Sequence, residues 1–600
     1  MITTKTLPRA VLLGRGFLWT GGARAQTTST WTGGGSDDNW GTSGNRSGAG
    51  VPSGDSGNNV AVFAGTTRTA TTNNLGNWSR SFGQMYFASG AGSFTLSGDT
   101  FGFRPYLGSG LQEIFQNSAN TQTIGVSEFS FRNAANSQIN LNAGDLVIST
   151  PNMYIDANGS TTRSLVVTGS DSTRRTVTFA GNVNKGDSGN DPDMYIQGNK
   201  RALVTGSLTF GSGNDGSVFV DDGVLQFSGA GTMTGGRPVI GSTSGSGNAA
   251  VWLDTAGTTF GRQLEVRNGS SGRRTMGGLN TSGTTTFSGE FVGNAGDYDL
   301  AAATGGTVNF TGTRSVNAAL HVNRPDGSTT FGGSVVLSGG NTAVDKGFNI
   351  YGGVLEIGDL PGVMGDVANF IEFNAASGDS GTFRYSGGSF TTTRRLWIDN
   401  PGITRAAINV SGPGTTLTWN PSDGVRSQNL TKTGAGSLVF GGGITGGNVA
   451  VEAGMLILTG SSSYSGGTTV SGGTLEVSAG GSQGGSPSAL GTGAVSIAAG
   501  GRVAYWLSLS GADTITNAFS LSGGTLHTTD GANTYSGQVT LVSGASTISA
   551  QYEDTITLSG GLTGSGNVLF TQSGGTGSYN APTYVLSGTG ANTGTVRVDG

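Results

Sequence analysis

The sequence predicts an all-β fold, a right-handed parallel β-helix (β-solenoid) with coils of about 20 residues. Three observations predict it. Glycine accounts for 112 of 600 residues and proline for only 13. Short apolar bursts alternate with Gly, Asn and Ser clusters, and the clearest bursts recur at a nearly constant spacing. Glycine enrichment without a period of three excludes collagen, and a repeat this short matches one turn of a β-solenoid.

Length and charge narrow the possible classes of protein. A chain of 600 residues is too long for one ordinary globular core. A solenoid resolves this problem because its core is a thin, continuous line. Charged residues make up 11% of the chain and the net charge is −5, which argues against charge-driven disorder and against a nucleic-acid partner. Cysteine is absent, so disulfides, Cys-ligated zinc and thiol catalysis are excluded.

The repeat is clearest after residue 430. Glycines 436, 454, 473 and 493 each begin a burst, so the step from one burst to the next is nearly constant. Because alternate residues of a strand share a face, these bursts predict two stacked apolar ladders. One contains Leu438, Leu456, Leu475 and Val495, and the other contains Phe440, Leu458, Val477 and Ile497.

The same alternation predicts which residues point outward. Glu476 and Ser496 fall on the outer face, and so do the apolar residues Val439, Met455 and Ile457. We therefore expect an extra loop to cover part of that face.

Four segments are predicted along the chain. Residues 1–25 resemble a signal peptide, with a positive start, an apolar run and a small-residue cleavage site. Residues 26–64 are a predicted N-terminal cap region, and residues 65–429 a divergent β-helix with a faint repeat up to about 200. Residues 430–600 carry the clear repeats and are expected to be truncated at the C-terminus. The stretch from Leu111 to Gln116 has some helical character.

Several motifs resemble the passenger-associated transport repeat, also called the autotransporter-associated β-strand repeat. The stretch Leu430–Leu438 is similar to its opening and Tyr464–Val477 to its centre. Looser copies are Asn533–Leu541 and Leu586–Val598, the second without the aromatic residue before the glycine. Trp31–Trp40 resembles the usual start of large bacterial proteins with these repeats. The resemblance implies a β-helical passenger exported across the outer membrane, with a barrel or a sorting tail beyond this sequence.

A serine protease is a weak alternative. Gly-Asp-Ser-Gly occurs at residues 54–57, 186–189 and 378–381, and the chain has two histidines, His321 and His527. A catalytic triad needs a histidine within hydrogen-bond reach of the serine. In the proteases with this motif the histidine precedes the serine. Only Ser380 of the third copy has a histidine upstream, His321. The segment between His321 and Ser380 is too short for the two β-barrels that normally carry such a triad. We therefore interpret the three copies as turns.

A polysaccharide lyase or hydrolase is the stronger enzyme alternative. It requires clustered carboxylates or a basic residue on one face. The candidates are Asp191 with Asp193, Asp221 with Asp222, and Asp254, although aspartate is also favoured in turns.

Two further features of the sequence are typical of binding sites. Residues 211–216 faintly resemble a calcium-binding nonapeptide, but that motif functions in tandem and does not recur here. Trp31 and Trp40 could stack on sugars if exposed, although we expect them to cap the first coil.

The sequence thus predicts a surface-exposed or secreted structural and adhesive module of a Gram-negative-type bacterium, and not an enzyme. It identifies no catalytic, cofactor-binding or metal-binding residue. The expected partners are surface polysaccharide or other cells, and membrane contact is expected only through a C-terminal anchor beyond this chain. A carbohydrate-active enzyme on the same scaffold, or a spacer that aids export, remains the alternative.

Overall fold

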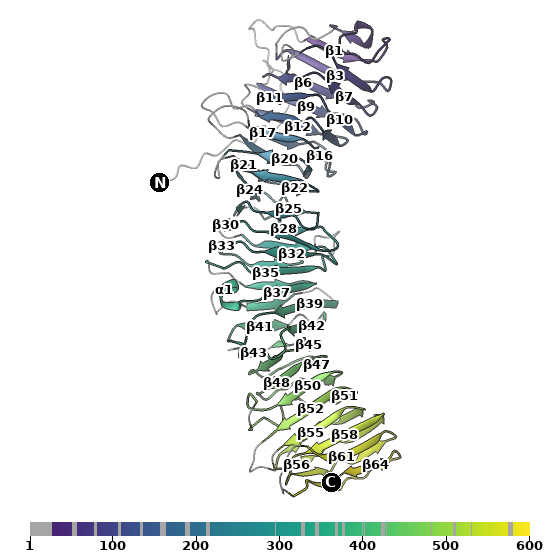
Figure 1. Ribbon diagram of the computed structural model, residues 1–600, viewed down its shortest axis with the longest axis vertical. Coiled ribbons are helices and arrows are strands. Elements are labelled where there is room, and N and C mark those ends of the chain that lie inside the picture. Colours follow the sequence, from purple (N-terminus) through teal and green to yellow (C-terminus); the bar gives the residue numbers. More distant parts are fainter. Residues whose placement is uncertain are drawn as a thin grey trace.

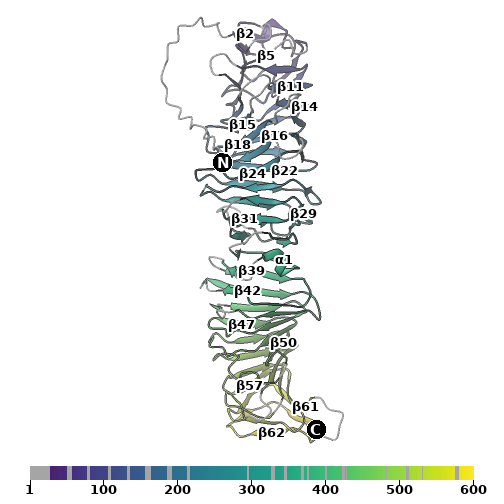
Figure 2. The same cartoon turned by 90° about the vertical axis from the view of Figure 1, so that its left-hand side faces the viewer.

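A computed structural model describes most of residues 27–599. It leaves out the predicted signal peptide at 1–25 and residues 26, 51–56, 77–80, 106–109, 132–135, 156–163, 186–191, 212–215, 270, 294–295, 326–330, 343–346, 366–369, 375–377, 399, 401, 422–425, 428, 482, 508–511, 530, 574–579 and 600. The described chain is a long rod of stacked coils, from β1 (Thr27–Trp31) at one end to β64 (Val596–Asp599) at the other (Figures 1 and 2). The parallel pairing of successive coils confirms the predicted β-solenoid.

A typical coil contributes one strand to each of three faces. The first face is a 13-stranded sheet from β2 (Arg46–Gly48) to β33 (Arg314–Val316). The second face is a 15-stranded sheet from β4 (Ala70–Asn73) to β44 (Arg426–Ser427). Neighbouring strands in these sheets are parallel, except for β1 and β2.

The third face and the C-terminal coils complete the rod. The third face begins as a 7-stranded sheet and continues as a 15-stranded sheet. In the C-terminal part, the strand of each coil that would belong to the first face belongs to a 10-stranded sheet. The strand that would belong to the second face belongs to a 4-stranded sheet. These four sheets run from β5 (Ser81–Phe82) to β23 (Thr232–Thr234), from β26 (Thr259–Phe260) to β63 (Ala591–Asn592), from β40 (Phe390–Thr392) to β64, and from β53 (Thr514–Ile515) to β62 (Thr583–Leu586).

Helix contributes little to the described residues. The α-helix α1 (Leu360–Met364) lies in chain order between a strand of the third face and one of the second. The stretch with predicted helical character is the strand β9 (Leu111–Gln116). No helix among the described residues is long and apolar enough to cross a membrane.

The predicted apolar ladders are largely confirmed. Leu438, Leu456 and Leu475 stand in register on β46 (Ser437–Phe440), β48 (Met455–Leu458) and β50 (Gly473–Val477), and each is fully buried. The same strands stack the second ladder, formed by Phe440, Leu458 and Val477.

The predicted fourth member of each ladder is wrong. Leu475 pairs with Val503 on β52 (Gly501–Trp506). Val495 lies on β51 (Val495–Ala498), on the third face, and pairs there with Thr468. Ile497 is on the same strand and pairs with Val470. The physical reason is an insertion at 478–494, which makes the step from β50 to β52 longer than the step from β48 to β50. The burst at 493–497 is therefore a strand of a different face.

The outward side of these strands is less exposed than alternation alone suggests. Val439, Ile457 and Glu476 stand in register there, yet each is at most 9% exposed. The Glu476 carboxylate accepts a hydrogen bond from the Ser478 hydroxyl at 2.7 Å. Ser496 is exposed, as predicted.

Coils of the predicted short length occur where a coil has only two strands. Ser437 pairs with Met455, and Met455 pairs with Thr474. In this region the second face has no described strand between β44 and β53. Three-stranded coils are longer. In one of them, Gln84 pairs with Glu113 of the next coil.

Apolar residues of the connecting segments fill the place of the missing strand. Ile444, Tyr464 and Leu490 are fully buried although none lies in a strand. The Tyr464 hydroxyl lies 2.6 Å from the Thr468 hydroxyl. The aromatic residue of the repeat motif therefore closes the third side of a two-stranded coil.

The N-terminal end is closed by two tryptophans and a hairpin. Trp31 and Trp40 are fully buried, which confirms that they cap the first coil. The hairpin of β1 and β2 is antiparallel. The Arg46 guanidinium lies 5.8 Å from the Trp31 ring and 5.6 Å from the Trp40 ring. The hairpin pairs with the first edge strand of the solenoid, and such an edge would otherwise invite aggregation.

Candidate functional site

The residues of the repeat motif serve the fold and do not form a surface site. Tyr464 and Lys432 are both fully buried. The Lys432 ammonium donates to the carbonyls of Gly434, at 2.9 Å, and Ala453, at 3.2 Å, and burial lowers the pKa of Lys432 to about 8. These bonds join two successive coils. A ligand site must be sought on the outward side of the strands.

Such a site lies on the first face, around two stacked aromatic side chains. Tyr195 on β18 (Asp193–Ile196) pairs in register with Phe219 on β21 (Ser217–Val220). Both point outward and are half-buried. Their ring centroids are 4.7 Å apart and the rings are 15° from parallel. The Arg267 guanidinium covers Phe219 at 4.5 Å from the ring centroid, within the range of a cation–π interaction.

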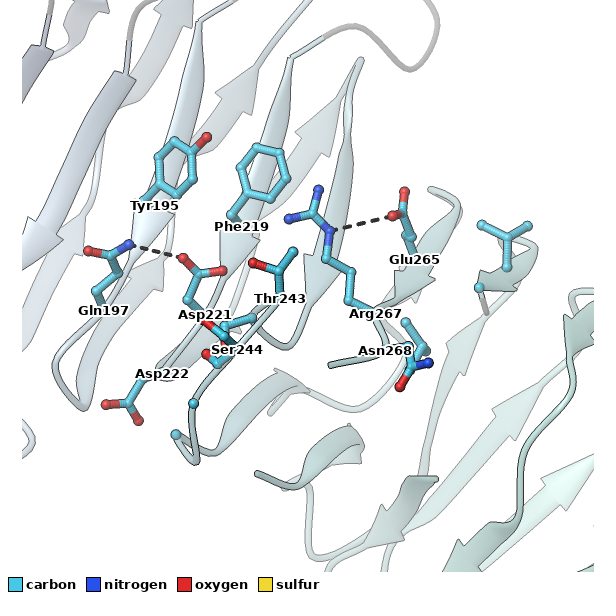
Figure 3. A pocket seen from close by; sticks show the side chains of 16 residues that line it. Tyr195, Gln197, Phe219, Asp221, Asp222, Thr243, Ser244, Glu265, Arg267 and Asn268 are labelled. Atoms are coloured by element: carbon cyan, nitrogen blue, oxygen red, sulfur yellow. Dashed lines mark hydrogen bonds and ion pairs between the residues drawn. The ribbon is translucent and has the colours of Figure 1, made fainter. Parts of the chain in front are cut away.

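These residues line an open groove of about 1190 Å³. Figure 3 shows the two rings side by side, with Arg267 and Glu265 beyond Phe219 and the segment carrying Thr243 and Ser244 below them. Aromatic, hydroxyl, amide, carboxylate and guanidinium groups thus share one surface. Such a mixture can hold a ligand that has both apolar faces and hydroxyl groups.

The groove contains three carboxylates, and each has its own partners. Asp221 accepts a hydrogen bond from the Gln197 amide at 3.0 Å, and burial raises the pKa of Asp221. Asp222 accepts from the backbone N–H of Asn199 at 3.2 Å. Glu265 pairs with Arg237 at 2.6 Å and lies 3.6 Å from Arg267. Asp221 and Asp222 point in different directions, and Arg267 lies between Asp221 and Glu265 (Figure 3).

The other predicted carboxylates are not brought to the groove lining. Asp193 begins β18, and its carboxylate accepts from the backbone N–H of Ser217 at 3.0 Å. Asp254 follows β25 (Ala249–Leu253) on the second face and accepts from Gln226 at 2.6 Å. Asp191 lies outside the described residues. The sequence therefore predicted only the Asp221 and Asp222 part of this site.

The described parts of the protease and calcium motifs do not form a site either. Residues 186–189 and most of 54–57 and 211–216 lie outside the described residues. Gly378–Gly381 begins β39 (Gly378–Tyr385) on the third face, whereas His321 lies on β34 (Leu320–Val322) on the second. Among the described residues, no group of three or more His, Cys, Asp or Glu side chains could hold a metal ion.

A buried ionic cluster near His321 was not predicted from the sequence. The Asp299 carboxylate is fully buried and pairs with Arg273 at 2.7 Å and with Arg324 at 3.0 Å. Arg273 also donates to the Arg324 carbonyl at 2.8 Å. Burial and the nearby Arg324 lower the pKa of His321. These contacts hold Arg324, just after β34, against the second face. The Phe331 ring stacks on Trp252 of the same face, with ring centroids 5.5 Å apart.

Comparisons with known proteins agree with the repeats and the coil. The family model of the passenger-associated-transport-repeat matches residues 449–477, which contain Tyr464 and the strand β50. The chain is also 28% identical over 421 residues to the adhesin BmaC autotransporter of Brucella suis biovar 1 (strain 1330). That alignment covers 66% of this chain and 12% of the relative. No solved structure matches the chain.

These findings confirm the resemblance drawn from the sequence motifs. The matched repeat occupies two-stranded coils of the solenoid, and the similarity to the adhesin extends over most of the chain. They also support a place at the cell surface or outside the cell, reached across the outer membrane of a Gram-negative bacterium. The chain thus resembles autotransporter passengers in its repeat at 449–477 and, over about two thirds of its length, an autotransporter adhesin.

Proposed function

We propose that this surface-exposed or secreted passenger is an adhesive module that binds polysaccharide, on other cells or on surfaces, through the groove on its first face. The observation that carries the proposal is the outward pair of stacked rings, Tyr195 and Phe219, within a surface of hydrogen-bonding side chains. Half-exposed aromatic rings provide apolar contact to the faces of sugar rings. The name of the relative, an adhesin, favours the same role.

We also propose that the groove binds without catalysis. Catalysis of glycoside hydrolysis by two carboxylates requires them to flank one bond. Here Glu265 is neutralised by two arginines, and Asp221 and Asp222 face different partners. A carbohydrate-active enzyme remains the alternative, because three carboxylates line one groove. It predicts that a bound polysaccharide is shortened.

A binding assay with purified full-length chain tests both statements. We expect the chain to bind at least one polysaccharide of a panel of neutral and acidic bacterial and plant glycans. Tyr195→Ala should weaken this binding about tenfold, since an aromatic contact contributes on the order of 1 kcal/mol. No reducing ends should be released during long incubation. Release of reducing ends, abolished by Asp221→Asn, would establish the enzyme instead.

A matched control comes from the second face. Trp397 on β41 (Arg395–Ile398) is also half-buried and outward, and it stacks on Phe370 at 4.6 Å. Trp397→Ala should leave glycan binding unchanged. Equal losses from the Tyr195 and Trp397 variants would show that the groove is not the site. Absence of binding to every glycan would remove the proposed function.

A further inference from the structure

We infer that the ligand is an extended, uncharged glycan that lies parallel to the axis of the rod, along a track of outward side chains from β6 (Gln84–Phe87) to β21. This inference rests on the proposed function and specifies the class of ligand and how it lies. The track consists of the outward residues of six neighbouring strands of the first face: β6, β9, β12 (Asn136–Leu141), β15 (Ser164–Thr168), β18 and β21.

A second stacked aromatic pair marks the far end of the track. Tyr86 on β6 pairs in register with Phe115 on β9. Both rings point outward and are half-buried. Their centroids are 4.4 Å apart and their planes 7° from parallel. The same sheet thus carries two aromatic platforms, one at each end of a run of six strands.

The residues between the two platforms are not aromatic, and all but Val166 are polar. From Phe115 the register runs to Asn140 on β12 and Thr168 on β15. The adjacent outward row runs through Gln138 and Val166 and reaches Tyr195. Of these side chains, the half-buried Gln138 and Thr168 offer an amide and a hydroxyl group to a ligand that lies between the platforms.

The spacing of the coils suits a chain of sugar rings. Neighbouring strands lie about 4.8 Å apart, close to the length of one pyranose unit in an extended glycan. Three strand steps separate β9 from β18, so the platforms are roughly 14 Å apart and the whole track is roughly 24 Å long. A glycan of about five or six sugars spans it, whereas a disaccharide reaches one platform only.

The charge of the track favours an uncharged ligand. No lysine or arginine occupies an outward position on the six strands that form it. The guanidinium at the end of the track, Arg267 over Phe219, lies 3.6 Å from the Glu265 carboxylate, which offsets its positive charge. The acidic side chains there, Glu113 and Asp193, and Asp221 at the end of the track, repel sulfate or uronate groups and accept hydrogen bonds from hydroxyls. Glu113 already accepts from the Gln84 amide at 2.7 Å, a bond between neighbouring strands that holds both side chains in place.

Chain length provides the test. Binding of full-length chain to neutral β-1,4-linked gluco- and manno-oligosaccharides, from disaccharide to hexasaccharide, should strengthen steeply up to the hexasaccharide. Tyr86→Ala should weaken hexasaccharide binding about tenfold and disaccharide binding by no more than about twofold, because a disaccharide can still bind the Tyr195 platform whereas the long ligand contacts both. Tyr86→Phe, which keeps the ring, should bind as the unmodified chain does, and Trp397→Ala should also be silent.

Three results would overturn this inference. One is an affinity that does not depend on oligosaccharide length. Another is insensitivity of hexasaccharide binding to Tyr86→Ala when Tyr195→Ala still weakens it, which leaves the groove as the whole site and keeps the proposed function. A third is preferential binding of oligogalacturonates, which means that the ligand is acidic. If neither neutral nor acidic glycans bind, both the track and the proposed function fail.

Discussion

The coils between residues 437 and 477 and those between residues 84 and 220 solve the same packing problem in different ways. In the first region two strands and a buried residue of the connecting segment, Ile444 or Tyr464, close a short coil. The ladders there combine leucines with Phe440 and Val477. In the second region three strands close each coil, and the step from one coil to the next is longer. The core there includes stacked rings such as Phe101 and Phe129, 5.5 Å apart.

The two regions indicate different roles, a scaffold role for the regular repeats and a binding role for the coils that carry the groove. Regular coils need a constant turn, and glycine supplies it: Gly454 and Gly473 have positive φ angles, and a Cβ at either would collide with a carbonyl of the preceding coil. The coils between residues 84 and 220, called irregular coils below, tolerate insertions because only the register of the strands must be kept. The outward aromatic platforms occur on these irregular coils, so we assign binding to them and a scaffold role to the regular repeats.

The largest expected effect is the introduction of a charge into a ladder of the regular coils. Leu475→Asp places an unpaired carboxylate in a fully buried position, which costs several kcal/mol. Since each coil folds against its neighbours, adjacent coils should unfold as well. Denaturant unfolding, followed together with limited proteolysis, measures both effects.

The neighbouring outward position is the control. Thr474→Asp alters a half-buried residue of the same strand and should change the unfolding free energy by less than about 0.5 kcal/mol. Equal losses from the two variants would show that the inward and outward positions have been misassigned.

The next largest effect concerns the residue that replaces a strand. Tyr464→Ala removes a fully buried ring from the open side of a two-stranded coil and should destabilise the chain by about 3–5 kcal/mol. Tyr464→Phe loses only the contact with the Thr468 hydroxyl and should cost about 1 kcal/mol. A Tyr464→Ala variant as stable as the Phe variant would contradict the idea that the ring closes the coil.

A smaller effect should appear as a pH dependence of stability. His527 is nearly buried, with its Nδ1 2.9 Å from the Ser549 hydroxyl and 3.2 Å from the Ser573 hydroxyl. Burial, with the charge of Arg502 nearby, lowers the pKa of His527 to about 4. The unfolded chain binds the proton more tightly than the folded chain. Stability contributed by neutral His527 is therefore present above about pH 6.5 and is lost as the pH falls toward 4, by up to about 3 kcal/mol.

Unfolding free energies measured between pH 7 and pH 4 test this expectation. The control is His527→Gln, which has no proton to gain over this range. If the two chains lose stability equally as the pH falls, the pH dependence originates elsewhere.

The sequence predicted the scaffold better than the site, for physical reasons. The ladder from Leu438 to Leu475 was predictable because its glycines recur at a nearly constant step. Val495 was misplaced because an insertion moves its burst to another face. Asp221 and Asp222 were recognised as a pair of neighbouring carboxylates.

The aromatic platforms could not be recognised before the structure was known. The sequence alone does not show that Tyr195 points outward and Phe129 inward, because the side of the sheet that each residue of a short strand faces is not known in advance. The signal for Tyr195 and Phe219 was the pair of short strands Asp-Met-Tyr-Ile and Ser-Val-Phe-Val, in which aromatic residues stand between apolar ones. Phe115 was obscured because its strand resembled a helical segment.

Footprinting with hydroxyl radicals tests the assignment of binding to the irregular coils most directly. The full-length chain is oxidised with and without the hexasaccharide that binds best, and the modified residues are located by mass spectrometry. We predict that the ligand protects Tyr86, Phe115, Tyr195 and Phe219, while the oxidation of the half-buried Met455 in the regular repeats is unchanged. Protection of Met455, with no protection of Tyr195 or Phe219, would contradict the account.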